Sequence, residues 1–190
     1  MTGIESWDGI DDTDNIIIEL DIGAGNTMTG GSFDVGINSV DPSWLSEASV
    51  QFSDSTGSAD PNAINLAPGA GEDAPGDMEF SSAGVIDFSD NALPDIVAGA
   101  DGILRLQFFE SFDDTADAID AFWRNAATPA LVAGLGIACT DQAACDAAIG
   151  GAGGPDLPPA PAVPTLSLFG MLALALVLAL GTALVLRRKA

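Results

Sequence analysis

The chain has 190 residues, with 28 acidic and five basic side chains and no histidine, so its net charge is −23. Such a charge repels the phosphates of nucleic acids and excludes a nucleic-acid-binding function. Without histidine, and with its single lysine at position 189, the chain cannot form a Ser-His-Asp triad, a Cys-His pair or a histidine-ligated zinc site. Any catalysis would therefore depend on carboxyl groups.

Short β-strands are predicted along the first two thirds of the chain. Residues 15–23 carry isoleucine or leucine at every even position, the period of a strand with one buried face. Further strands are predicted at residues 33–37, 48–52, 85–88 and 103–109, separated by turns rich in Gly, Pro and Asp at residues 23–26, 41–43, 60–62, 68–69 and 75–76. This pattern predicts a mainly β fold for residues 1–138, a β-sandwich of jelly-roll type. Outside the C-terminal tail, only residues 115–123 suggest a helical period.

Two hydrophobic pairs contain tryptophan, Trp44-Leu45 and Phe122-Trp123. They could form a platform that stacks on a sugar. Aromatic side chains in a sandwich of short strands more often fill the core, so we expect both pairs in the core.

Acidic residues are grouped in three regions expected to be loops. The groups are Asp8, Asp11, Asp12 and Asp14; Glu72, Asp73 and Asp77; and Asp113, Asp114, Asp117 and Asp120. Loop carboxylates can bind Ca²⁺, and the candidate ligands are Asp11, Asp12, Asp14, Asp113 and Asp114. None of the groups has the spacing of an EF-hand. The favoured interpretation is a solvated acidic surface without a cofactor.

Glu47 and Glu110 lie on or near predicted strands. A pair of carboxyl groups about 5–10 Å apart could serve as the acid and nucleophile of a glycosidase. Nothing in the sequence sets that distance. The favoured interpretation is that both are ordinary charges at strand edges and that the protein is not an enzyme.

Cys139 and Cys145 lie close together in the segment ACTDQAAC. Outside the cytoplasm, such a pair is expected to oxidise to a disulfide. We place it at the junction between the body and a stalk formed by residues 139–162. Prolines and glycines dominate residues 150–164, which predicts a flexible, extended linker that packs no core.

Residues 166–186 form an apolar run of 21 residues without a charge. About 20 apolar residues span a bilayer as a helix, so the run predicts a single transmembrane helix; a buried helix of the body is the alternative. Arg187, Arg188 and Lys189 follow the run, while residues 1–163 carry a net charge of −26. Basic flanks stay in the cytoplasm, which places the acidic body outside the cell. An exported body should begin with a signal peptide, which the acidic start lacks, so we expect an N-terminal piece to be missing; a tail-anchored protein is the alternative.

Residues 163–170, with the sequence VPTLSLFG, lead into this apolar run and its basic end. This order resembles a bacterial C-terminal sorting signal of the IPTL-CTERM type, a relative of the PEP-CTERM signal. In that pattern, Ile-Pro-Thr-Leu, two variable residues and Trp-Gly precede a membrane helix and a basic end. The residues that correspond to the motif are Val163 (in place of Ile), Pro164, Thr165, Leu166, Phe169 (in place of Trp) and Gly170. The resemblance implies that a membrane-embedded transpeptidase of the exosortase type recognises residues 163–190; an anchor that is never cut is the alternative.

Together these features predict an exported protein of the cell envelope or extracellular matrix with a structural or adhesive role. The expected partners are an exosortase-like processing enzyme and the membrane, with exopolysaccharide as a further candidate. The body would lie outside the cell and the C-terminus in the cytoplasm, unless processing releases the body to the cell surface. The alternatives are a calcium- or carbohydrate-binding surface domain and a plain membrane-anchored protein.

Overall fold

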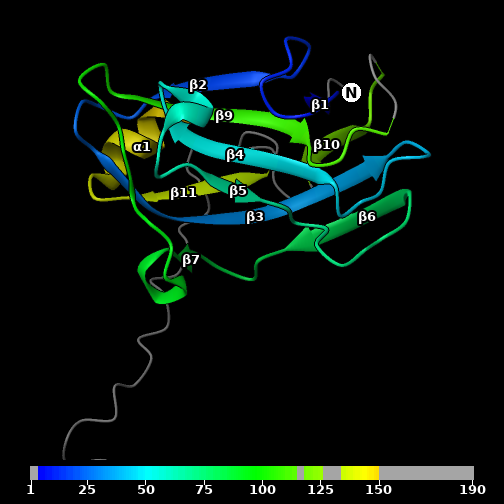
Figure 1. Ribbon diagram of the computed structural model, residues 1–190. Helices are drawn as coiled ribbons and strands as arrows, with labels where there is room; N and C mark the ends of the chain where they lie inside the picture. Colours follow the sequence, from blue (N-terminus) through cyan, green and yellow to red (C-terminus); the bar gives the residue numbers. More distant parts are fainter. Residues whose placement is uncertain (1–3, 115–117, 126–133, 150–190) are drawn as a thin grey trace, which may run out of the picture. The chain divides into compact units, whose positions relative to one another are not determined.

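The computed structural model describes residues 4–114, 118–125 and 134–149, all within the first of the two units into which the chain divides, Met1–Asp156. The described residues form mainly β structure in two antiparallel sheets (Figure 1). The predicted mainly β fold is therefore confirmed.

The first sheet is built around the long strand β3. Two strands pair with one side of β3 (Thr27–Ser39): β10 (Ala121–Asn125) and β11 (Leu135–Cys139). β1 (Ile4–Ser6) pairs with the far side of β10. The other side of β3 pairs with β6 (Gly76–Ser81), β7 (Ile86–Asp87) and β8 (Ile96–Val97). β3 has 13 residues, so several shorter strands pair with it one after another along its length.

The second sheet has four strands in the order β2-β9-β4-β5. Their bounds are β2 (Ile17–Asp21), β9 (Ile103–Glu110), β4 (Ala48–Asp54) and β5 (Ile64–Leu66). Two single-turn 3-10 helices, Gly57–Ala59 and Ser89–Asn91, lie in the connections, and the helix α1 (Gln142–Ala148) follows β11.

The hydrophobic core lies between the two sheets. The ring of Phe108 on β9 meets that of Trp123 on β10 edge to face, with ring centres 5.2 Å apart, and both side chains are fully buried. The indole N–H of Trp123 donates to Ser6 Oγ at 2.7 Å, which satisfies its one polar atom. Apolar positions of the predicted strands 48–52 and 103–109 supply much of this core.

The alternation holds less well at the ends of the strands and in the aromatic pairs. Leu20 and Ile22 are buried, but Ile16 lies before β2 begins and is exposed. Of the two pairs expected in the core, Leu45 and Trp123 are buried, while their neighbours Trp44 and Phe122 are exposed. Neighbouring strand residues point to opposite faces, so one member of the pair Phe122-Trp123 had to leave the core.

Two further expectations are corrected by the structure. The suggested helix at residues 115–123 is wrong for its last three residues, which belong to β10, because pairing with β3 overrides a weak local helical pattern. The body also continues beyond residue 138, because α1 packs on β11 and β2 and carries Cys145 into the core.

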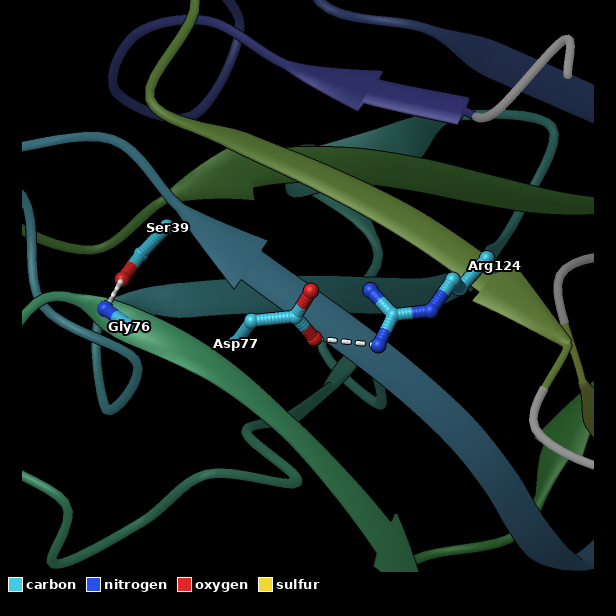
Figure 2. Close-up of polar contacts among 4 residues, drawn as sticks. All are labelled: Ser39, Gly76, Asp77 and Arg124. Atoms are coloured by element: carbon cyan, nitrogen blue, oxygen red, sulfur yellow. Dashed lines mark hydrogen bonds and ion pairs between the residues drawn. The ribbon is translucent and has the colours of Figure 1, made fainter.

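A glycine on β3 lets an arginine cross the sheet surface. Arg124 on β10 reaches over β3 to form an ion pair with Asp77 on β6 (Figure 2). Gly36 lies opposite Arg124 in the register, and a Cβ there would come within 2.7 Å of Arg124 Nε. Next to Asp77 at the start of β6, the N–H of Gly76 donates to Ser39 Oγ at 3.0 Å. The missing side chain of Gly36 is therefore what leaves space for the ion pair.

No helix within the described residues is long and apolar enough to cross a membrane. The predicted span at residues 166–186 and the linker at 150–164 lie outside the described residues.

Candidate functional site

Several chain segments that are far apart in sequence meet at one end of the two sheets. The segments are the end of β1, the connection from β3 to β4, the end of β9 and the start of β10. Main-chain hydrogen bonds join them: Glu110 N–H donates to Asp8 O at 2.9 Å, Ser111 N–H to Glu47 O at 2.9 Å, and Asp120 N–H to Ser6 O at 2.9 Å. This network places four acidic residues close to one another.

Glu110 is the last residue of β9 and is 1% exposed. It is in phase with the buried residues Leu104, Leu106 and Phe108, since every second residue of a strand faces the same way. Its carboxyl group therefore points to the same side as the core rather than into solvent.

Two other carboxyl groups approach Glu110. One oxygen each from Glu47, Glu110 and Asp114 can be chosen so that all three lie within 4.8 Å of one another. Glu47 precedes β4 and is held by a hydrogen bond from the N–H of Trp44 to its Oε2 at 2.6 Å. Asp114 is exposed, so the group opens to solvent on its side. We call Glu47, Glu110 and Asp114 the acidic triad.

A buried aspartate adjoins the triad. Asp120 lies directly before β10, is 2% exposed and accepts a hydrogen bond from Ser43 Oγ at 3.0 Å through Oδ1. Asp8, after β1, is buried as well. Both were expected in solvated loops, and the structure corrects this: the strands that they flank draw them into the protein interior.

Burial and crowding change the acidity of these groups. Burial raises the pKa of Glu110 to about 9, and the neighbouring carboxyl groups of Asp120 and Glu47 add to the rise. Burial also raises the pKa of Asp120, although the hydrogen bond from Ser43 and the proximity of the Glu110 carboxyl group oppose that rise. Without a cation, the pair therefore retains a proton at neutral pH.

Several buried carboxyl oxygens at this site have no hydrogen-bond donor within the described residues. Neither carboxyl oxygen of Glu110 accepts a hydrogen bond from a described donor, nor does Oδ2 of Asp120. In the described part of the chain, Arg124 pairs with Asp77 and Arg105 donates to Gln107, so neither arginine of the body forms an ion pair with the triad. Buried carboxyl oxygens without donors are what a proton or a hard cation would satisfy.

The predicted calcium ligands lie in different surroundings in the structure. Asp114 joins the triad, and Asp113 is an exposed neighbour in sequence. Asp11 instead accepts a hydrogen bond from Ser58, and Asp12 accepts one from the N–H of Asp14 at 2.9 Å. These local contacts are typical of turn aspartates. Within the described residues, then, the structure does not bring residues 11–14 together as a metal site.

The sequence suggested Glu47 and Glu110 as a pair of carboxyl groups but did not set their distance. The pairing of β4 with β9 brings them together, because Ala48 lies opposite Glu110. Sequence reasoning missed the contribution of Asp120. One signal was available for Glu110: it continues the two-residue period of the apolar positions of β9.

Cys139 at the end of β11 and Cys145 on α1 are joined by a disulfide. Near them, a hollow is lined by residues 22–26 with Thr140, Asp141 and Ala144, and it does not include the acidic triad. Asp117 and the residues of the predicted sorting signal and basic end lie outside the described residues; these are Val163, Pro164, Thr165, Leu166, Phe169, Gly170, Arg187, Arg188 and Lys189.

Comparison with protein-family models, curated proteins and solved structures gave no match to this chain. The functional argument therefore depends on the residues themselves.

Proposed function

We propose that this chain is an exported protein of the cell envelope, with a β-sandwich body that a C-terminal signal directs to an exosortase-like transpeptidase. The observation that carries the proposal is the order of three features at the end of the chain: the Pro-Thr-Leu motif, the apolar run 166–186 and the basic residues 187–189. Each feature has a separate physical role, in recognition, membrane insertion and orientation. A structural or adhesive role follows for the body.

The strand order supports a jelly-roll body. Each sheet combines strands from the two halves of the body. The first has the order β1-β10-β3-β11, with β6, β7 and β8 also paired to β3, and the second has the order β2-β9-β4-β5. In a jelly roll, two Greek keys pair early with late strands across two facing sheets in this manner. Such a body has its connections at the two ends, where surface proteins present binding residues.

The disulfide supports an extracellular body. Disulfides persist in oxidising compartments and are rare in the cytosol. Cys145 is fully buried, and the bond ties α1 to the end of β11 shortly before the predicted linker. It therefore fastens the last described element of the body at the point where the chain leaves for the tail.

A non-enzymatic role is also part of the proposal. The carboxyl oxygens of Glu47 and Glu110 are close enough for the two-carboxylate chemistry of a retaining glycosidase, at about 5 Å. However, Glu110 is only 1% exposed, so it offers almost no surface to a sugar ring.

The proposal is tested by following the full-length chain, fused to a secretory signal peptide, in a bacterium that has an exosortase processing such tails. We expect the wild-type chain to lose residues after the motif, measured as a smaller intact mass and as release of the body from the membrane fraction. Pro164→Ala should retain the tail, because the extended segment at the membrane boundary would be lost. The matched control is Pro161→Ala in the linker, which should be processed like the wild type. Retention of the complete tail by the wild-type chain would contradict the proposal.

A further inference from the structure

The acidic triad has the geometry of a site for a divalent cation. Calcium takes about six to eight oxygen ligands at about 2.3–2.6 Å, so ligand oxygens on opposite sides of the ion are about 5 Å apart. Oxygens from Glu47, Glu110 and Asp114 lie within 4.8 Å of one another, which is within this span. We propose that Glu47, Glu110 and Asp114 bind one Ca²⁺ ion at the end of the two sheets.

An independent observation points to a ligand at this place. The side chain of Glu110 is 1% exposed, and neither of its oxygens has a described hydrogen-bond donor. The adjoining Asp120 is 2% exposed, and its Oδ2 is also without one. Interiors rarely leave buried polar atoms unsatisfied. A cation held by Glu47, Glu110 and Asp114 would satisfy the oxygens of Glu110.

The donor set selects the type of ion. Carboxylate oxygens favour hard cations, whereas zinc is usually held by histidine or cysteine; this chain has no histidine and its two cysteines form a disulfide. Magnesium needs a tighter octahedron, at about 2.0–2.1 Å, and gives up its water reluctantly. Calcium accepts a more variable coordination geometry at longer distances, so three partly buried carboxylates are better matched to calcium.

The acidic triad is open to solvent on one side, and secondary structure holds its other ligands in place. Exposed Asp114 leaves the site open on one side, where water can complete the coordination. The site is otherwise fixed by secondary structure: Glu110 ends β9, and Glu47 immediately precedes β4, its neighbour in the sheet. The N–H of Trp44 holds Glu47 Oε2 at 2.6 Å, which orients this ligand. Calcium would thereby join the β3–β4 connection to the segment after β9.

The inference concerns the body alone and holds whether or not the tail is processed. The test uses the full-length chain in a mild detergent, freed of metal with EDTA. Isothermal titration with Ca²⁺ and thermal unfolding with and without Ca²⁺ are measured. We expect one Ca²⁺ per chain and a rise in the melting temperature of several degrees at about millimolar Ca²⁺, with a much smaller rise for Mg²⁺.

Three variants make the test specific. Glu110→Gln keeps the shape but removes the charge, and should weaken Ca²⁺ binding at least tenfold. Asp114→Asn changes an exposed residue, so it should fold normally and also weaken binding. Glu72→Gln removes an exposed acidic charge elsewhere and should bind like the wild type. Absence of binding by the wild type would overturn the proposal. So would an equal response of the wild type, Glu110→Gln and Asp114→Asn, which would show that Ca²⁺ only screens the acidic surface.

Discussion

At the end of β9, the carboxyl group of Glu110 lies on the face of the strand where all other residues are apolar. Glu110 follows Leu104, Leu106 and Phe108 on the core-facing side, yet it carries an ionisable group. A position that could have been filled by a fourth apolar side chain is thus given to a group that is costly to bury as an ion. Such an exchange is typical of functional sites, where local stability is sacrificed.

The raised pKa of Glu110 predicts an unusual dependence of stability on pH. In EDTA, the folded state binds about one more proton than the unfolded state between the ordinary pKa of 4.5 and about 9. The free energy of unfolding should therefore fall as pH rises through this window, by about 1.4 kcal/mol per pH unit at most. The groups facing Glu110 are Asp120, Glu47, Ser43 and Asp114. Urea unfolding from pH 5 to pH 9 measures the slope.

Glu110→Gln is the control for this pH effect. The amide cannot ionise, so its stability should change less with pH than that of the wild type. Equal slopes for the two proteins would mean that Glu110 ionises as an ordinary surface carboxyl group.

The ion pair across β3 gives a second prediction at the residue scale. Gly36→Val should displace the side chain of Arg124 and break its contact with Asp77. The pair is partly exposed, so its loss should cost about 1 kcal/mol or less. In a double-mutant cycle, Asp77→Asn should lower the free energy of unfolding in the wild type and leave it unchanged in Gly36→Val. An undiminished effect of Asp77→Asn in the valine background would mean that Gly36 does not open the path.

At the scale of elements, one asparagine joins the start of the body to its end. Asn26, in the turn between β2 and β3, donates to the carbonyls of Ile22 at 2.9 Å and Asp141 at 3.1 Å. Its Oδ1 accepts from the N–H of Asp141 at 2.9 Å and from Thr140 Oγ1 at 2.9 Å. Asp141 in turn caps α1 by accepting from the N–H of Ala144 at 3.2 Å. The helix is thus docked by polar contacts as well as by the disulfide.

We predict that Asn26→Ala lowers the free energy of unfolding by about 2–4 kcal/mol, because several buried hydrogen-bonding groups lose their partner together. Chemical denaturation measures this loss. Asn91→Ala is the matched control: Asn91 is exposed and donates to Asp87 O, so its loss should cost well under half as much. Similar losses for both variants would contradict the docking role of Asn26.

At the scale of the whole molecule, the net charge affects the stability of the folded state. Residues 1–163 carry a net charge of −26, and a compact body concentrates this charge more than an unfolded chain does. Carboxylates on every side repel one another through a distance of about 10 Å at 0.1 M salt. Screening should therefore favour the folded state.

We predict that the melting temperature in EDTA rises by several degrees between about 0.05 M and about 0.5 M NaCl, measured by circular dichroism. Choline chloride should have the same effect at equal ionic strength, because screening does not depend on the identity of the monovalent cation. An unchanged or lower melting temperature at high salt would show that self-repulsion is not limiting the stability of the body.

The amino-acid sequence determined the features that depend on neighbours along the chain. Alternation marked the strands at residues 33–37 and 48–52, because a strand exposes successive side chains to opposite faces wherever it pairs. The sequence also suggested a weak helical period at residues 115–123, and this prediction failed at Ala121–Trp123, where strand pairing with β3 was stronger than the local signal.

Only the tertiary structure decided which acidic residues meet. Glu47, Glu110 and Asp120 are separated by many residues, and their distances are set by the register of β4 on β9 and by the place of β10 beside β3. The sequence grouped the acids by proximity along the chain, whereas pairing between distant strands grouped them by position at one end of the sheets. Burial of Asp8 and Asp120 followed from the same cause, since segments that are distant in sequence enclose both residues and no local pattern reveals this.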